Sequence, residues 1–219
     1  MRLASFQSVF LGPVMLGAVE LETEVLKPGR RQMVVAARLT DGDRTLIEAR
    51  GVLLRSGNVE LPPGAGEDAA DGRDAMPSPD GFGAAEGRWG NDGETAFHKT
   101  SNTIRMVRGG PEQSRPDGAA WFRLDCPVVP GERPSPAQRA VAAADFGNGL
   151  AHPVPFGDYV FVNCDLNVWL LREPEGEWIG LRSVTEVSEN GSGLTRTALY
   201  DTRGRVGTAG QSLYVDVAG

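Results

Sequence analysis

Apolar and polar residues alternate near the start of the chain, as they do in a β-strand with one face in water. The alternating positions are Val19, Glu20, Leu21, Glu22, Thr23, Glu24 and Val25. The turn sequence Lys27-Pro28-Gly29 follows, and two further apolar runs, at residues 32–39 and 45–54, flank Asp41-Gly42-Asp43. The stretch that starts at Arg2 also favours a strand and a turn. The pattern therefore predicts an antiparallel meander.

Residues 57–92 differ from this meander in composition. They are rich in Gly, Pro, Ala, Asp and Glu, contain Pro62-Pro63-Gly64, and hold almost no β-branched residues. Such a composition is typical of a loop or a partly disordered linker. Strands are expected to resume near residues 95–107 and again at 121–124.

One segment has the pattern of a helix. Ser135 can cap its start, Pro136 suits the first helical position, and residues 137–144 are strong helix formers. The helix is rich in Ala and Val nearly all round, which predicts burial. Gly147-Asn148-Gly149 is interpreted as its C-cap. Four strands are then expected at residues 159–171, 177–187, 193–200 and 206–215.

The last block of strands resembles the first after a shift of 160 positions. Leu21 falls on Leu181, and Asp41 falls on Asp201. The shared order of strands and turns indicates a tandem duplication. We expect an N-terminal half at residues 1–112 and a C-terminal half at 113–219. The C-terminal half has a leading strand and a helix, and the first half lacks both. We therefore expect that the chain is shortened at its N-terminus, or that something else fills the groove.

Net charge and cysteine usage limit the partners. The formal charge of −7 repels nucleic acid and anionic lipid surfaces, so neither is an expected ligand. No apolar run approaches the roughly 20 residues that span a bilayer. Cys126 and Cys164 could pair only once, and a chain of this size needs no such bridge. Reduced thiols in a cytoplasmic protein are the simpler interpretation.

A helix wrapped by a curved antiparallel sheet is the hotdog fold. The chain resembles the type II acyl-CoA thioesterases and their actinobacterial thioesterase-like relatives. The stretches that carry the resemblance are Trp121-Phe122-Arg123-Leu124, Pro134-Ser135-Pro136-Ala137-Gln138-Arg139, Ala144-Asp145-Phe146-Gly147-Asn148-Gly149, Phe161-Val162-Asn163-Cys164-Asp165-Leu166 and Gly207-Thr208-Ala209-Gly210-Gln211-Ser212-Leu213. The resemblance implies an α+β double hotdog with two curved antiparallel sheets, whose central helix is clear only in the second half.

The resemblance also implies a site. In this family a catalytic water is held by an Asp at the helix end, a Thr or Ser on the next strand, and a Gln on the last strand. The matching positions are Asp145, Asn163 and Gln211, so an Asn stands where the family has a hydroxyl residue. The implied substrate is an acyl-CoA, and the implied products are a free acid and CoA.

Thioester chemistry fits these residue types. The leaving thiol has a pKa of about 8.5, so it departs without a strong acid. The reaction needs an oriented water and a stabilised oxyanion, and neither a covalent nucleophile, a metal nor a cofactor is expected. A carboxylate at a helix C-terminus opposes the helix dipole, which favours function for Asp145 over an ordinary loop role.

Each site residue also has a structural interpretation. Gln211 could bond a strand end, and Asn163 could be an ordinary structural amide. Asp165 and Asn167 are in phase with Asn163 and could replace it, although a bond from one of them to backbone at the helix is the better expectation.

Two other functions stay open. A hotdog protein could bind an acyl group without cleaving it, which Asn163 and the incomplete first half favour. A hotdog dehydratase would need a histidine on or near the helix, but His98 and His152 both lie in or beside loops. Association of two chains through sheet edges is a further expectation.

Overall fold

The structure, a computed structural model, describes residues 1–65, 76–84, 97–110 and 113–219. Its elements in chain order are β1 (Arg2–Phe10), β2 (Glu20–Lys27), β3 (Gln32–Asp41), β4 (Arg44–Leu54), the 3-10 turn η1 (Pro79–Gly81), α1 (Phe97–Thr100), β5 (Asn102–Arg108), β6 (Asp117–Leu124), α2 (Pro136–Ala144), α3 (Gly147–Leu150), β7 (Tyr159–Asn163), β8 (Asp165–Leu170), β9 (Trp178–Val187), β10 (Ser192–Asp201) and β11 (Gly204–Val217).

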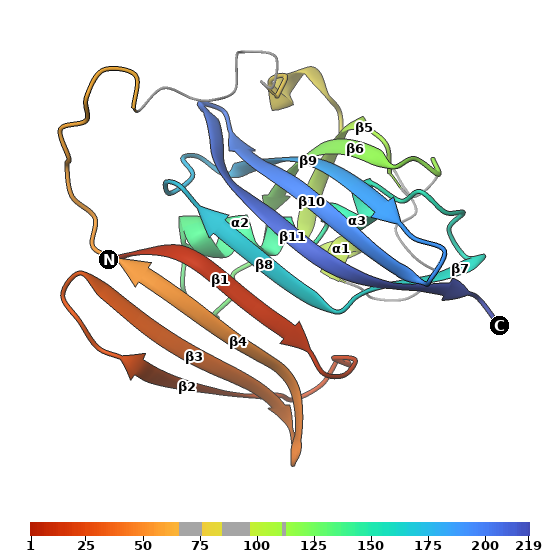
Figure 1. The fold of residues 1–219 in the computed structure, drawn as a ribbon, viewed down its shortest axis with the longest axis horizontal. Helices are drawn as coiled ribbons and strands as arrows, with labels where there is room; N and C mark the ends of the chain where they lie inside the picture. The colour runs from red at the N-terminus through yellow and green to blue at the C-terminus, as the bar shows by residue number, and fades with distance from the viewer. Residues whose placement is uncertain (66–75, 85–96, 111–112) are drawn as a thin grey trace.

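The strands of the described residues form one continuous antiparallel sheet (Figure 1). Its order is β2-β3-β4-β1-β8-β11-β10-β9-β6-β5, and β7 pairs with β11 beside this path. The β1–β8 pair joins the meander β1–β4 to the strands of the second half. β2 and β5 lie at the two ends of the order, so each is a candidate for the expected association through sheet edges. That association stays a prediction.

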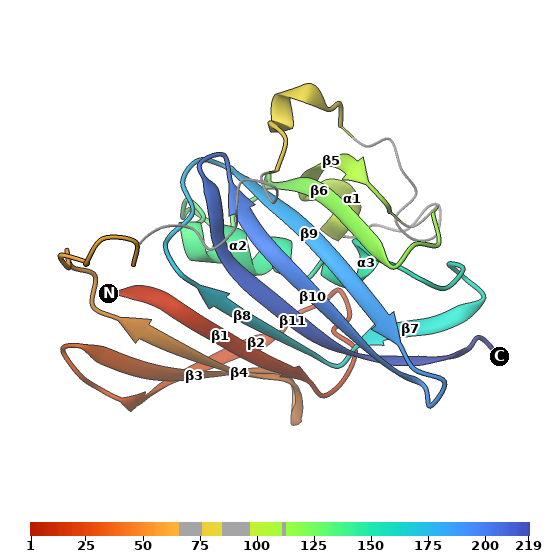
Figure 2. The same ribbon diagram turned by 45° about the horizontal axis from the view of Figure 1, so that its top comes forward.

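Helix α2 forms where the sequence predicts it. The Ser135 side chain accepts a hydrogen bond from the backbone N–H of Gln138, whose own side chain accepts from the N–H of Ser135. Ala140, Ala143 and Ala144 are fully buried, and their small side chains let the helix approach the sheet closely. The helix lies across one face of the second-half strands (Figure 2). The main hydrophobic core therefore lies between α2 and this part of the sheet.

The two halves share strand lengths and irregularities at the offset of 160 positions. The bounds of β3 and β10 differ by 160 at both ends. A β-bulge interrupts the β3–β4 pairing between Leu39 and Thr40, and its counterpart interrupts the β10–β11 pairing between Leu199 and Tyr200. Bulges bend and twist a sheet locally. The two copies therefore share their curvature as well as their strand order.

The β1–β8 pairing is symmetric about one residue pair. Gln7 lies opposite Asn167, and adding 160 to the first number gives the second. Ser5 lies opposite Trp169, and Val9 lies opposite Asp165. Ser5 and Asp165 are equivalent positions at the offset of 160, and so are Val9 and Trp169, so the offset exchanges these two pairs. Gln7 and Asn167 thus lie on the approximate two-fold axis of the double hotdog.

The halves differ in what covers their sheets. Leu21 on β2 is 66% exposed, whereas its counterpart Leu181 on β9 is 1% exposed. Val25 is likewise exposed, and its counterpart Thr185 is buried. Helix α2 contacts β6, β8, β9, β10 and, from the first half, β1. The expected uncovered apolar face is therefore present on β2.

Four sequence expectations need correction or limits. Within the strand expected near residues 95–107, Phe97–Thr100 forms α1 and Asn102–Arg108 forms β5, and residues 95 and 96 lie outside the described ranges. The strand predicted at residues 159–171 is broken at Cys164 into β7 and β8. The expected C-cap at residues 147–149 is instead part of the helical turn α3, which follows the end of α2 and contacts β6, β9, β10 and β11. The described parts of the predicted linker, 57–65 and 76–84, contain η1 and no strand, and its other residues lie outside the described ranges.

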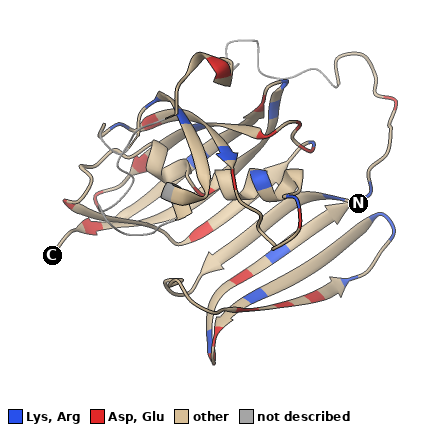
Figure 3. Ribbon diagram, turned by 180° about the vertical axis from the view of Figure 1, so that it is seen from behind, with Lys and Arg blue, Asp and Glu red and all other residues tan. Residues whose placement is uncertain are grey.

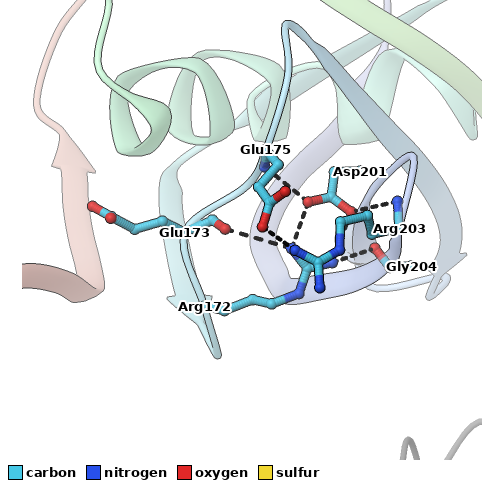
Figure 4. A network of polar contacts seen from close by, with 6 residues as sticks. All are labelled: Arg172, Glu173, Glu175, Asp201, Arg203 and Gly204. Atoms are coloured by element: carbon cyan, nitrogen blue, oxygen red, sulfur yellow. Dashed lines mark hydrogen bonds and ion pairs between the residues drawn. The ribbon is translucent and has the colours of Figure 1, made fainter. Parts of the chain in front are cut away.

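A buried ion pair fixes the β10–β11 turn (Figure 4). The carboxylate of Asp201, which is 2% exposed, accepts two hydrogen bonds from Arg172, at 2.5 and 2.7 Å. It also accepts the backbone N–H groups of Glu175 and Arg203, at 2.8 and 2.9 Å. The side chains of Arg203 and Glu175 form a salt bridge above it. Burial raises the pKa of Asp201, but these hydrogen bonds and the Arg172 charge outweigh it, so the pKa is lowered.

We predict that Asp201→Ala lowers the free energy of unfolding by about 2 kcal/mol, because Arg172 and two N–H groups lose their acceptor. The measurement is urea denaturation. Asp41→Ala is the matched control, because Asp41 holds the same position in the first half but is exposed and lies 3.7 Å from Arg44. Its expected effect is below about 0.5 kcal/mol. Since the pKa of Asp201 is lowered, its contribution is complete above pH of about 4 and is lost as the pH falls further. Equal losses for the two variants would contradict this account.

Candidate active site

The predicted site residues gather at the C-terminal end of α2. Asp145 is the C-cap residue of this helix, Asn163 is the last residue of β7, and Gln211 lies in the middle of β11. The side-chain amide of Asn163 donates a hydrogen bond from Nδ2 to Oδ1 of Asp145 at 2.8 Å. The structure therefore brings together a carboxylate and an amide that are 18 positions apart in the sequence.

Gln211 reaches from β11 to the turn between α2 and α3. Its Nε2 donates to the backbone carbonyl of Asp145 at 3.2 Å, and its Oε1 accepts the backbone N–H of Asn148 at 3.1 Å. Gln211 is 1% exposed. The amide thus bridges two orphan backbone groups where α2 ends and α3 begins, which leaves it one Nε2 proton and one lone pair beyond these bonds.

Asp145 combines contact with solvent and a raised pKa. The residue is exposed to solvent, yet desolvation by the protein packed around its carboxyl group raises the pKa of that group. The hydrogen bond from Asn163 lowers the pKa and offsets only part of this rise. A carboxylate with a raised pKa accepts a proton more readily than an ordinary aspartate does, which suits a general base.

Buried hydroxyl groups support the turn, and the sequence reasoning missed them. Ser183 and Thr197 lie 2.9 Å apart through their hydroxyls, and Thr185 and Thr195 lie 2.7 Å apart. All four are buried, and Thr195 lies directly opposite Gln211 in the β10–β11 pairing. The one signal in the sequence is that these hydroxyls occupy inward positions of their strands.

The other polar candidates have structural partners. A bond to backbone at the helix is expected from one of Asp165 and Asn167, but Asp165 instead accepts hydrogen bonds from Ser212 on β11. His152 is buried against the rings of Phe156 and Phe161, and its Nδ1 lies 2.6 Å from the carbonyl of Val154. Burial is the main cause that lowers the pKa of His152. His98 lies in α1, away from α2 in the chain.

The described ranges contain neither a metal-binding cluster nor a membrane-spanning helix. Within them, no three His, Cys, Asp or Glu side chains gather in a way that could hold a metal ion. No helix in the same part of the chain is long and apolar enough to span a membrane.

A hollow of about 870 Å³ lies away from Asp145, on the first-half sheet. Its lining includes Glu22, Arg38 and Glu48, and Asp145, Asn163 and Gln211 do not line it. Charges of both signs are interspersed on β2, β3 and β4 (Figure 3). Arg38 lies 3.8 Å from Glu22 and 3.5 Å from Glu48, and all three side chains are exposed. Such pairs are weak in water, and the surface has no single sign of charge.

An antiparallel sheet wrapped around a buried helix is the arrangement of a hotdog-fold protein. Two solved structures have this fold. An acyl-CoA thioesterase II from Mycobacterium marinum aligns with a TM-score of 0.69 at 15% identity, over 100% of this chain and 82% of that one. A protein of unknown function with a hot dog fold from Alicyclobacillus acidocaldarius aligns with a TM-score of 0.69 at 14% identity, over 100% and 80%.

Sequence comparison identifies the family. The model of the acyl-CoA thioesterase C-terminal domain matches residues 70–215, and that of the N-terminal domain matches residues 1–55. The first match alone covers more than half of the 219 residues. The chain therefore belongs to the acyl-CoA thioesterase family and is an enzyme of the thioester-hydrolase class. No functionally curated protein matched it.

We predict that Gly147→Ala disturbs this site. A Cβ at Gly147 would lie 2.4 Å from Oγ1 of Thr197 and 2.9 Å from Oε1 of Gln211. The expected loss is about 1–3 kcal/mol in the free energy of unfolding, because a tightly packed core must shift. Gly210→Ala is the control, since its Cβ would meet nothing nearer than 3.9 Å. Chemical denaturation of both variants checks this, and equal stability of the two would contradict it.

Proposed function

We propose that the chain hydrolyses acyl-CoA thioesters to a free acid and CoA, with a water molecule activated at Asp145. The observation that carries the proposal is the contact between the Asp145 carboxylate and the Asn163 amide, at a solvent-accessible position where burial raises the pKa of the carboxyl group. Membership of the acyl-CoA thioesterase family supports the same substrate class.

The reaction needs one proton acceptor and no covalent intermediate between the enzyme and the acyl group. The water oxygen attacks the thioester carbonyl carbon while one of its protons passes to Asp145. The resulting oxyanion re-forms the carbonyl, and the carbon–sulfur bond breaks. CoA leaves as a thiolate, which then takes up a proton, because its thiol has a pKa of about 8.5. Asp145 returns its proton to solvent, and the free acid remains.

The two amides have different roles in this proposal. Asn163 donates one Nδ2 proton to Asp145, which fixes the carboxylate, and its Oδ1 can accept a hydrogen bond from the water. Gln211 holds the Asp145 backbone from below and can offer its second Nε2 proton to the same water. A water molecule held in one orientation attacks the thioester carbonyl faster than a freely moving one, because the entropy of positioning is already lost.

Binding of an acyl group without hydrolysis is the second candidate. Asn163 stands where the family has a hydroxyl residue, and it already donates a proton to Asp145, so fewer of its groups are left for the water. Mass spectrometry of acyl-CoA after long incubation with the protein separates the two functions. A free acid and CoA support hydrolysis, and an intact thioester that stays bound supports binding alone.

We predict that Asp145→Asn reduces kcat by about 10²- to 10⁴-fold, because the amide cannot accept the proton of the water. The side chain keeps its size, so circular dichroism should show a folded protein. Asp216→Asn is the control, since the exposed Asp216 carboxylate bonds Tyr214 and Val217 near the C-terminal end of β11. Wild-type turnover by the Asp145→Asn variant would refute the mechanism.

The pH dependence should follow Asp145. The ionised carboxylate is the active form, so activity falls as the pH drops through its raised pKa. Asn163→Ala removes the hydrogen bond that lowers this pKa, and the acid limb of the kcat profile should move to higher pH. Profiles of the wild type and the variant against a short-chain acyl-CoA test this. A limb that stays in place, or moves to lower pH, would show that Asn163 does not act on the catalytic carboxylate.

We also propose a cytoplasmic location. Cys126 and Cys164 are both free thiols, and unpaired cysteines are typical of proteins in a reducing compartment.

A further inference from the structure

A β-bulge separates β7 from β8 just after Asn163. Asn163 lies opposite Leu213 on β11, and Asn167 lies opposite Gly210. Three residues lie between the paired positions on the β7–β8 side, and two lie between them on β11. The extra residue is the mark of a bulge.

The bulge changes which residues face the helix. On β8 the even-numbered residues Leu166 and Val168 are buried in the core under α2. On β7 the odd-numbered residues point to this side, since Phe161 contacts His152 and Asn163 bonds Asp145. In an unbroken strand the side chains alternate without interruption, so Asn163 would face away from α2. The bulge therefore permits the contact between Asn163 and Asp145.

Asp165 clamps this bulge to β11. Its Oδ1 accepts the backbone N–H of Ser212 at 2.7 Å, and its Oδ2 accepts the Ser212 hydroxyl at 3.0 Å. Ser212 is the residue after Gln211, and Asp165 is the second residue after Asn163. One carboxylate thus ties the start of β8, two residues after Asn163, to β11 at the residue that follows Gln211.

The first half offers an internal comparison. The same bulge interrupts the β1–β4 pairing, where Leu3 lies opposite Leu53 and Ser5 lies opposite Val52. At the offset of 160, Ser5 takes the place of Asp165, and Leu3 takes the place of Asn163. The bulge therefore belongs to the fold and tolerates a serine. The carboxylate is present only in the half whose bulge aims a polar side chain at the helix end.

We propose that Asp165 is a positioning residue for the hydrolytic site, which holds Asn163 against Asp145 by clamping Ser212. The inference rests on the proposed function for its kinetic consequence, and it rests on the contacts of β7, β8 and β11 for its geometry. Asp165 does not touch the water or the thioester. It acts through the placement of Asn163.

The test compares Asp165→Ser with Asp165→Asn. Serine is the residue that the first-half bulge already carries, so the variant should fold, but its short side chain cannot make both bonds to Ser212. Asparagine can still accept the N–H and contact the hydroxyl, and it lacks the charge just as serine does. Asp165→Ser should lower kcat about 10-fold with KM changed less than about 2-fold, because small misplacements of catalytic groups are costly. Asp165→Asn should keep kcat near that of the wild type.

A second measurement does not depend on turnover. The carboxyl carbon of Asp145 can be titrated by carbon NMR and assigned by its loss in Asp145→Asn. Asn163→Ala should raise the pKa of Asp145, because the bond that lowers it is removed. Asp165→Ser should raise this pKa above that of Asp165→Asn. Loss of the Asp165 charge alone would lower the pKa of Asp145 in both variants. A difference between the two Asp145 pKa values therefore reports the placement of Asn163.

Asp216→Ser is the matched control. The Asp216 carboxylate also accepts one backbone N–H and one hydroxyl, from Val217 at 2.8 Å and Tyr214 at 2.7 Å, but it is not next to a site residue. The Asp216→Ser substitution should change neither kcat nor the pKa of Asp145. Equal Asp145 pKa values in Asp165→Ser and Asp165→Asn would overturn the inference, and so would an unchanged value in Asn163→Ala. A wild-type protein that cleaves no thioester would overturn the proposed function and leave the titration to decide on Asp165.

Discussion

The site depends on how the end of α2 is attached to the sheet. Gln211 is buried in the middle of β11, and its amide bonds the carbonyl of Asp145 and the N–H of Asn148. A buried amide without partners is costly, so the turn has little freedom to move away from these groups. The alanine face of α2 sets the height of the helix above the sheet, and Gln211 fixes where its chain turns. Asp145 then lies beside Asn163 because Ala144 before it is buried against the sheet and its own carbonyl is held by Gln211.

The duplicated architecture explains why the polar site has one location. The two halves share strand lengths and bulges at an offset of 160. At the same offset, Leu3 stands in place of Asn163, and Gly51 stands in place of Gln211. Neither residue can orient a water or bond a helix end. The fold is thus common to both halves, whereas the chemistry of the proposed site is particular to the second.

Much of the fold could be predicted from local patterns. Ser135 and Pro136 define a helix start through well-understood capping chemistry, and alternation defines the strands. The family resemblance implied that Asp145, Asn163 and Gln211 share a site, whereas the direct bond between Asp145 and Asn163 is visible only in the structure. The break at Cys164 could not be predicted, because the residues around it are all compatible with a strand, and the bulge is visible only in the pairing with β11. For the same reason the sequence could not assign Asp165 to Ser212, which lies 47 positions away.

Asp201 and Asp145 have opposite pKa shifts because their hydrogen-bond partners differ. Burial favours the neutral acid at both Asp201 and Asp145. Asp201 meets a guanidinium and two backbone N–H groups, and together these lower its pKa below the ordinary value. It stays ionised and serves as an anchor. Asp145 receives a neutral amide hydrogen bond from Asn163, which is too little to offset burial, so its pKa is raised. A carboxylate that is poorly compensated in this way holds a proton more readily, and a water-activating base needs that property. The partners therefore distinguish the two carboxylates: a positive charge keeps Asp201 ionised as an anchor, and a lone amide leaves Asp145 with the raised pKa that the proposed mechanism uses.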